Sequence, residues 1–209
     1  MKEKDLLWKV HPIFPTPVYI SHLGRNFLKK EIKYIENCKT NLLPNHGNFV
    51  SKEKYVLNKL PMLNLKKDLL KHINKYLKEV INTDNNVSLY ITQSWLNYTN
   101  KNQYHHEHFH GNSYLSGVLY IKAKEDTDKI YFHKKNKEVF QFSIKNYNLF
   151  NSTEWFFNTA ETMIILFPSY LMHSVRLKND DNERISLAFN VYVKGKIGNC
   201  NEITELILE

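Results

Sequence analysis

The chain has 209 residues, of which 42% are hydrophobic and 13% aromatic. This composition excludes a disordered protein, and the length suits one domain with a substantial core. No apolar run approaches the roughly 20 residues that cross a bilayer, and residues 1–5 are charged where a signal peptide would be apolar. Two cysteines, Cys38 and Cys200, argue against a disulfide scaffold and predict a reduced, cytoplasmic protein.

The net charge of +8 comes mainly from lysines that are spread along the chain. No arginine-rich block and no nucleic-acid-binding motif accompanies them. An anionic partner such as nucleic acid would suit this charge, but the scattered positions favour a solvated lysine surface.

Two helices are expected in the first half. Residues 12–20 hold three prolines and predict an extended strand at a sheet edge. Residues 26–37 predict a helix with Leu28, Ile32 and Ile35 on one face. Residues 41–51 are typical of a turn. Residues 61–81 predict a longer helix with Pro61 at its first position. Its apolar stripe consists of Leu65, Leu69, Ile73, Leu77 and Val80 or Ile81.

From residue 87 the pattern changes to short strands separated by turns. We expect strands over residues 87–97, 113–123, 129–133, 139–143, 162–167, 171–177 and 183–194, and an apolar tail over 203–208. Residues 147–157 predict an aromatic connection, and Gly117 predicts a bulge or the close approach of a ligand. The order of elements predicts a mainly β fold with N-terminal helices (α+β), a sandwich or jelly roll backed by two helices.

The segment 104–121 holds four of the ten histidines within six residues and then becomes apolar. In an extended chain His106, His108 and His110 would share one face, with His105 and Glu107 on the other. Neutral imidazole is the commonest metal-binding side chain, so histidines that converge at a strand end predict a metal site. A solvated histidine-rich loop is the alternative.

The second half supplies a partner for this cluster. His173 follows the segment 167–169, and Arg184 comes eleven residues after it. Arg184 and Ser186 share a face of their strand. The guanidinium fork suits a carboxylate, to which a nearby hydroxyl can also donate a hydrogen bond.

This ordered set resembles the 2-oxoglutarate/Fe(II)-dependent oxygenase superfamily, which uses His-x-Asp/Glu, a distal His and Arg-x-Ser. It is more similar to a subfamily, common in marine bacteria and their phages, that carries His-x-His-Pro-Asn-Ser before Ser-Gly-Val-Tyr-Tyr. Gly111 and Leu119 depart from that pattern. The resemblance covers nearly the whole chain through residues 14–17, 108–113, 116–120, 167–169, 173, 184–186 and 189–190.

The resemblance implies a double-stranded β-helix, a cupin-like jelly roll. One domain would span residues 1–209, with helical support at 24–82 and the β-helix core at 87–195. It also implies a dioxygenase that uses Fe(II), O2 and 2-oxoglutarate to hydroxylate a substrate, with release of succinate and CO2. The implied iron ligands are His108, His110 and His173. Arg184 and Ser186 would hold the far carboxylate of 2-oxoglutarate. Further candidates for the pocket are Ser116, Tyr120, Asn97 and Ser113.

One departure from the superfamily concerns the metal itself, because His110 stands where Asp or Glu is usual. Two other ligand pairs stay open, His106 with His108 and His105 with Glu107. Two other functions also stay open: a cupin-like three-histidine metalloenzyme without 2-oxoglutarate, and a non-catalytic module for an anionic partner. Neither a substrate nor an oligomeric state follows from the resemblance.

The remaining candidates are interpreted as structural. Packing is favoured for Trp95 and Trp155, and a weak site role for Asn190. We expect His72 to be packed or at the surface. Surface positions are expected for His11, His22, His46 and His133.

Overall fold

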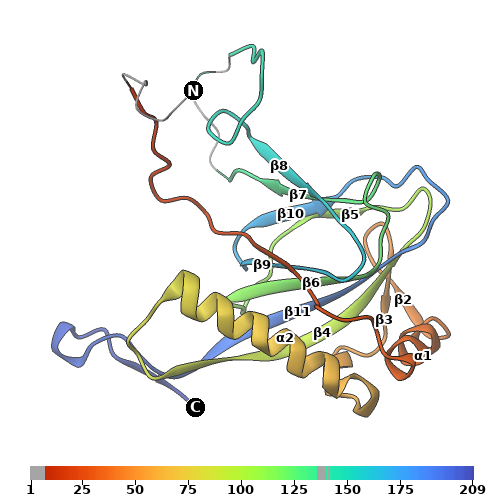
Figure 1. Ribbon diagram of the computed structural model, residues 1–209, viewed down its shortest axis with the longest axis horizontal. Helices are drawn as coiled ribbons and strands as arrows, with labels where there is room; N and C mark the ends of the chain where they lie inside the picture. The colour runs from red at the N-terminus through yellow and green to blue at the C-terminus, as the bar shows by residue number, and fades with distance from the viewer. Residues whose placement is uncertain (1–7, 136–139, 141) are drawn as a thin grey trace.

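The computed structural model describes residues 8–135, 140 and 142–209. Its strands form two antiparallel sheets that face each other (Figure 1). The larger sheet has the order β1-β9-β6-β11-β4-β3-β2, with β12 paired to β11, and the smaller has the order β5-β10-β7-β8. The mainly β fold with two helices is therefore confirmed.

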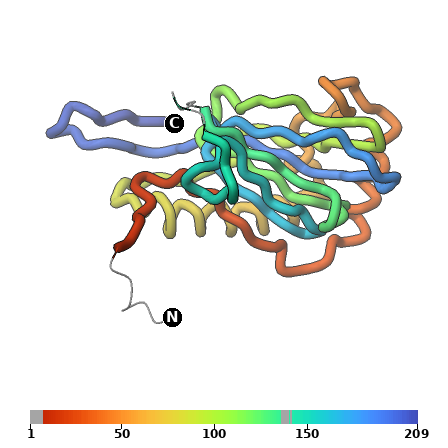
Figure 2. The backbone as a smooth tube through the Cα atoms, turned by 90° about the horizontal axis from the view of Figure 1, so that it is seen from above, coloured from red at the N-terminus to blue at the C-terminus, as the bar shows by residue number. Residues whose placement is uncertain are grey.

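The larger sheet consists of β1 (Tyr19–His22), β2 (Leu42–Pro44), β3 (Phe49–Ser51), β4 (Val87–Thr99), β6 (Leu115–Lys122), β9 (Met163–Pro168), β11 (Arg184–Ile197) and β12 (Leu206–Leu208). The smaller sheet consists of β5 (His105–His108), β7 (Lys129–His133), β8 (Glu154–Asn158) and β10 (Met172–Val175). The end of β11 and β12 form an arm that extends past the body of the molecule (Figure 2).

Helix α2 (Leu63–Tyr76) lies along the face of the larger sheet that is turned away from the smaller one (Figure 1). Leu65, Leu69 and Ile73 are fully buried there, as predicted. The rest of the predicted stripe is less buried because the helix ends in the π-helical turn η4 (Leu77–Ile81). Two 3-10 turns, η2 (Val56–Asn58) and η3 (Leu60–Met62), precede α2. Pro61 lies in η3 and not at the first position of α2. No helix in the described ranges is long and apolar enough to span a membrane.

Helix α1 (Lys29–Cys38) confirms the first predicted helix, but its buried face differs from the prediction. Ile35 is buried, whereas Ile32 is 37% exposed. Glu31 is buried instead, because its carboxylate accepts hydrogen bonds from Arg25 and from the Leu28 backbone N–H, each at 2.8 Å. A buried carboxylate, paired with a partly exposed arginine, thus takes a position where an apolar stripe would run.

Several strand predictions need correction. The first strand begins only at Tyr19, and β2 and β3 form a hairpin where only a turn was expected. The expected strand 139–143 lies partly outside the described residues, and its described members, 140, 142 and 143, are in no strand. The strand next to β7 is instead β8, in the supposed connection, where Phe157 packs against Phe132 at 6.0 Å between ring centroids.

Strand β11 separates the two sides of the larger sheet by simple alternation. Its apolar face packs with the helices through Ile185, Leu187, Phe189 and Val191. Its other face turns toward the smaller sheet and carries Arg184, Ser186, Ala188 and Asn190. One strand therefore supplies both a core and a row of polar groups between the sheets.

Gly117 on β6 lies opposite Phe189 on β11. A Cβ atom at Gly117 would lie 2.1 Å from Cζ of Phe189 and 2.9 Å from Cδ2 of Leu166. The group that approaches this glycine is therefore a core phenylalanine and not a ligand, and the strands are in regular register at this point.

We predict that Gly117→Ala lowers the free energy of unfolding by about 1–3 kcal/mol, because the added methyl overpacks the ring of Phe189. Gly111→Ala is the matched control, since a Cβ there meets nothing within 4 Å, and its effect should stay within about 1 kcal/mol. Urea denaturation of both variants measures the difference. Equal stabilities of the two variants would contradict this packing.

Candidate metal centre

The structure brings His108, His110 and His173 together between the two sheets. His108 ends β5, His173 lies opposite it on β10, and His110 follows in the next turn. Their ring centroids lie 4.2 Å (108–173), 5.1 Å (110–173) and 5.3 Å (108–110) apart. One ring nitrogen from each lies within 4.8 Å of the others, which suits a single metal ion.

Each of these imidazoles has an oxygen acceptor at Nδ1. His108 donates to the His106 carbonyl at 2.8 Å, and His173 to the Leu171 carbonyl at 2.9 Å. The Nδ1–H of His110 donates to Oδ1 of Asn190 at 2.6 Å. Because a carbonyl oxygen only accepts, these partners place the proton on Nδ1 and leave the Nε2 lone pair free for a metal.

The Nε2 atoms of His108 and His110 lie only 3.3 Å apart. With both Nδ1 atoms protonated, two lone pairs face each other across this distance. A cation between them would replace that repulsion by attraction. The three histidines therefore fit a divalent metal ion in donor type, tautomer and spacing.

Burial keeps these imidazoles uncharged. It lowers the pKa of His108 to about 4, with the charge of neighbouring histidines acting in the same direction. The pKa of His110 is also lowered by burial, and that of His173 lies well below its ordinary value, first through burial and then through His108 and His110. Neutral imidazole is the form that binds metals.

The predicted alternation of faces fails within β5. His173 pairs with His108, and Val175 pairs with His105. Between these two pairs β5 advances by three residues and β10 by two, so β5 contains one extra residue. This bulge turns His105 onto the same side as His108, and the two rings stack at 4.4 Å. Glu107 turns outward: its side chain is 52% exposed and lies 4.0 Å from His133. The pair of His105 with Glu107 is therefore not assembled.

A narrow cavity of about 30 Å³ adjoins the three histidines. Arg184 and Ser186 line it, as do Asn97 and Tyr120. Arg184 is only 4% exposed, and its guanidinium lies 5.2 Å from the centre of the Tyr120 ring. The guanidinium donates to the Lys129 carbonyl at 3.3 Å, and no carboxylate among the described residues lies within ion-pair distance of it. A buried guanidinium without a counter-ion favours an anionic ligand.

Two further groups in this cavity lack partners. Oδ1 of Asn97 and the hydroxyl of Tyr120 are buried without a hydrogen bond among the described residues. Burial raises the pKa of Tyr120, so its hydroxyl keeps its proton. Ser116 does not line the cavity. It is fully buried and its hydroxyl lies 2.9 Å from that of Ser169, which in turn donates to Ser113 at 2.8 Å.

The remaining tryptophans and histidines lie in various parts of the fold. Trp95 lines the cavity and packs on His110 at 5.5 Å between ring centroids, whereas Trp155 lies on β8. His72 is packed, with Nδ1 2.9 Å from the Tyr19 hydroxyl. His133 is not a surface residue, since its Nε2 bonds the Ser174 hydroxyl at 2.8 Å. The surface expectation holds for His11, His22 and His46.

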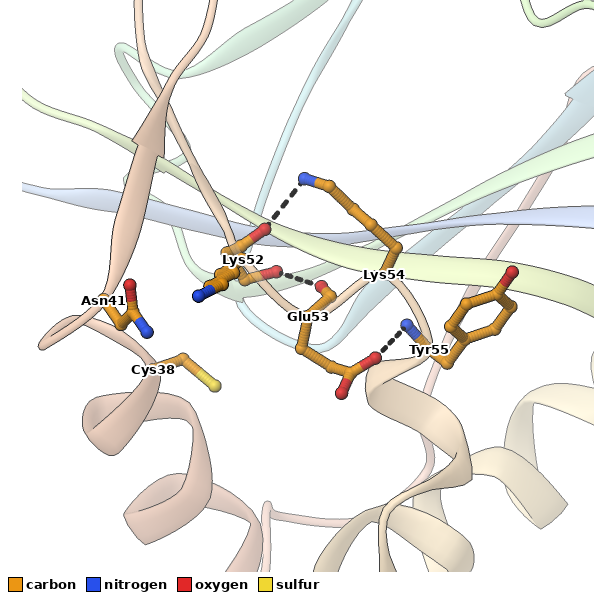
Figure 3. Close-up of a pocket in the computed structure, with 7 residues that line it drawn as sticks. Cys38, Asn41, Lys52, Glu53, Lys54 and Tyr55 are labelled. Atoms are coloured by element: carbon orange, nitrogen blue, oxygen red, sulfur yellow. Dashed lines mark hydrogen bonds between the residues drawn. The ribbon is translucent and has the colours of Figure 1, made fainter.

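A larger hollow, lined by Cys38, Asn41 and residues 51–55, is separate from the histidine cavity (Figure 3). Lys54 donates to the Ser51 carbonyl at 2.8 Å, and the Glu53 carboxylate accepts from the Tyr55 backbone N–H at 2.8 Å. Glu53 also pairs with Lys59. The polar groups of this hollow are thus mostly bonded to one another and leave little for a ligand.

Sequence reasoning placed one residue near the centre wrongly and undervalued another. His105 was assigned to the opposite face because a bulge cannot be read from alternation. Asn190 was given only a weak role, yet it accepts from His110. Two signals pointed to it: its parity with Arg184 and Ser186 on one strand, and its place in the segment 189–190 that matches the subfamily pattern.

A family model described as "Putative 2OG-Fe(II) oxygenase" matches residues 93–190, a segment that contains the three histidines, Arg184 and Ser186. A comparison with curated proteins gave no match.

Solved structures show the same fold. A 2OG-Fe(II) oxygenase family oxidoreductase from Burkholderia pseudomallei superposes with a TM-score of 0.56 and 16% identity, over 83% of each chain. HygX from Streptomyces hygroscopicus, with nickel, 2-oxoglutarate and hygromycin B bound, gives 0.55 and 13%, over 84% of this chain and 82% of its own. A prolyl-4-hydroxylase from Pseudomonas putida gives 0.53 and 12%, over 84% and 92%. The fold of this chain is therefore that of 2OG-Fe(II) oxygenases, a double-stranded β-helix.

We predict that Asn190→Ala weakens divalent metal binding about 10- to 100-fold, because His110 loses the acceptor that fixes its ring and tautomer. Titration with Ni²⁺ or Co²⁺ under calorimetry measures the dissociation constant. Asn158→Ala, on the exposed strand β8, is the control and should leave the affinity unchanged. Equal affinities of the two variants would show that Asn190 does not support the centre.

Stability without metal should depend on pH. Because burial lowers the pKa of His108 from 6.5 to about 4, the unfolded chain binds more protons between these values. Acidification from about pH 7 to about pH 5 should therefore reduce the free energy of unfolding. His108→Gln should flatten this dependence, and exposed His11→Gln should not. Urea denaturation at both pH values, with a chelator present, gives the slopes. A slope of opposite sign would contradict the burial of neutral imidazoles.

Proposed function

We propose that the chain is an Fe(II)- and 2-oxoglutarate-dependent dioxygenase that hydroxylates a substrate and releases succinate and CO2. His108, His110 and His173 would hold the iron, and Arg184 with Ser186 would hold the far carboxylate of 2-oxoglutarate. The observation that carries the proposal is the buried, unpaired guanidinium of Arg184 in a cavity that adjoins three convergent imidazoles.

Charge supports this assignment. Three neutral imidazoles leave both charges of a divalent ion uncompensated, and Arg184 adds a third positive charge nearby. Buried charge of one sign is costly unless an opposite charge accompanies it. 2-Oxoglutarate is a dianion whose two ends could meet the metal and the guanidinium, so one ligand would offset most of this charge.

The chain's own residues then have separate tasks. The oxygens of His106, Leu171 and Asn190 hold the three imidazoles in the metal-binding tautomer. Arg184 and Ser186 would orient the cosubstrate, and the Tyr120 hydroxyl can donate to one of its oxygens. Iron, when bound, supplies the oxygen chemistry. The cavity, about 30 Å³, has room for about two water molecules, so a dicarboxylate needs more space than the lining side chains now leave.

A second function is favoured by one observation, the histidine at position 110 in place of a carboxylate. A cupin-like three-histidine metalloenzyme would use the same centre without 2-oxoglutarate. The two functions differ in a spectroscopic test. Anaerobic protein given Fe(II) and 2-oxoglutarate should develop the absorption band of a 2-oxo-acid chelate in the first case and none in the second.

We predict that Arg184→Ala weakens 2-oxoglutarate binding about 10- to 100-fold, through loss of charge-assisted hydrogen bonds to a carboxylate. Arg176→Ala, which removes an exposed guanidinium, is the control. The measurements are the intensity of the chelate band as 2-oxoglutarate is added and the succinate released after oxygen is admitted. Binding that is equal in wild type and Arg184→Ala would remove the carboxylate-binding role.

A further inference from the structure

A second triangle of histidines adjoins the first and shares a corner with it. His105, His106 and His108 have ring centroids 5.3 Å (105–106), 4.4 Å (105–108) and 4.9 Å (106–108) apart. One ring nitrogen from each lies within 4.8 Å of the others. These dimensions match those of the triangle of His108, His110 and His173. The bulge in β5 creates this group, because without it His105 would face away from His108.

His106 gives an independent sign of a ligand. Its Nδ1 atom is buried and has no hydrogen-bond partner among the described residues. A buried polar atom left without a partner costs free energy, which a bound ligand can offset. The ring of His46, at the tip of the β2–β3 hairpin, lies 4.9 Å from the ring of His106 and could approach as a fourth donor.

We propose that His105, His106 and His108 form a second binding site for a divalent metal ion, with Zn²⁺ as the ion that suits it best. Zinc prefers nitrogen donors and accepts three protein ligands with a water molecule in the fourth position. All three histidines are only partly buried, so solvent can supply that water. This site does not depend on the oxygenase function.

The shared histidine makes the two sites exclusive. His108 gives its Nδ1 proton to the His106 carbonyl, so Nε2 carries its only available lone pair. One lone pair serves one ion, and a zinc ion at the second triangle therefore withdraws His108 from the first. Each chain holds one ion at a time on these five histidines.

The experiment removes the first triangle and asks whether metal still binds. His110→Gln/His173→Gln leaves His105, His106 and His108 in place. Titrated with Zn²⁺, and with Co²⁺ to record the intense absorption of a tetrahedral site, this variant should bind one ion. Addition of His106→Gln should weaken that binding at least about tenfold. Addition of His72→Gln, which lies on α2 away from the cluster, is the matched control and should not.

Two outcomes would overturn the proposal: the double variant folds by circular dichroism but binds no zinc, or its zinc binding survives His106→Gln. If the double variant does not fold, single His110→Gln breaks the same triangle and replaces it. The measured quantity is metal binding by a chain that lacks the first triangle. The result therefore does not depend on whether the wild-type protein turns over 2-oxoglutarate.

Discussion

The centre depends on three hydrogen bonds that fix the same tautomer in three imidazoles. Two of the acceptors are local, since His108 and His173 each donate to the carbonyl two residues earlier. The third is distant, because His110 donates to Asn190 on β11 in the other sheet. The tautomer of His110 therefore depends on how the two sheets pack. A centre of this kind cannot form in the smaller sheet alone.

Strand β11 and the turn before it connect this centre to Arg184 and Ser186, the proposed carboxylate-binding pair. Asn190, Ser186 and Arg184 lie on one face of β11 at spacings that alternation allows. The turn that joins β10 to β11 is anchored by Lys178, whose ammonium lies 2.8 Å from Asp128, with both side chains buried. Buried pairs of this kind contribute little net stability but favour one arrangement. Here the pair ties the turn to Asp128, the residue directly before β7.

Much of the fold followed from patterns with a single physical cause. The alternation in β11 predicted that Arg184 and Ser186 share a face, and the helical stripe of α2 predicted the burial of Leu65, Leu69 and Ile73. Predictions failed where tertiary contacts decide. Glu31 is buried because Arg25 pairs with it, and β8 forms because its aromatic residues pack on β7. The place of His105 was missed because an extra residue in a strand reverses every later side chain.

Because Glu107 points outward, both histidine triangles lack a negatively charged ligand. Ligand charge therefore cannot direct an ion to one triangle over the other, and the surroundings must do so. All three histidines of the first triangle line the cavity of Arg184, where a dicarboxylate can bridge the ion and the guanidinium, whereas His106 of the second triangle does not line it. A ligand that binds one of two exclusive states more tightly shifts the population toward that state. On this reasoning 2-oxoglutarate itself would draw the ion to His108, His110 and His173, and its depletion would favour the triangle that contains His106.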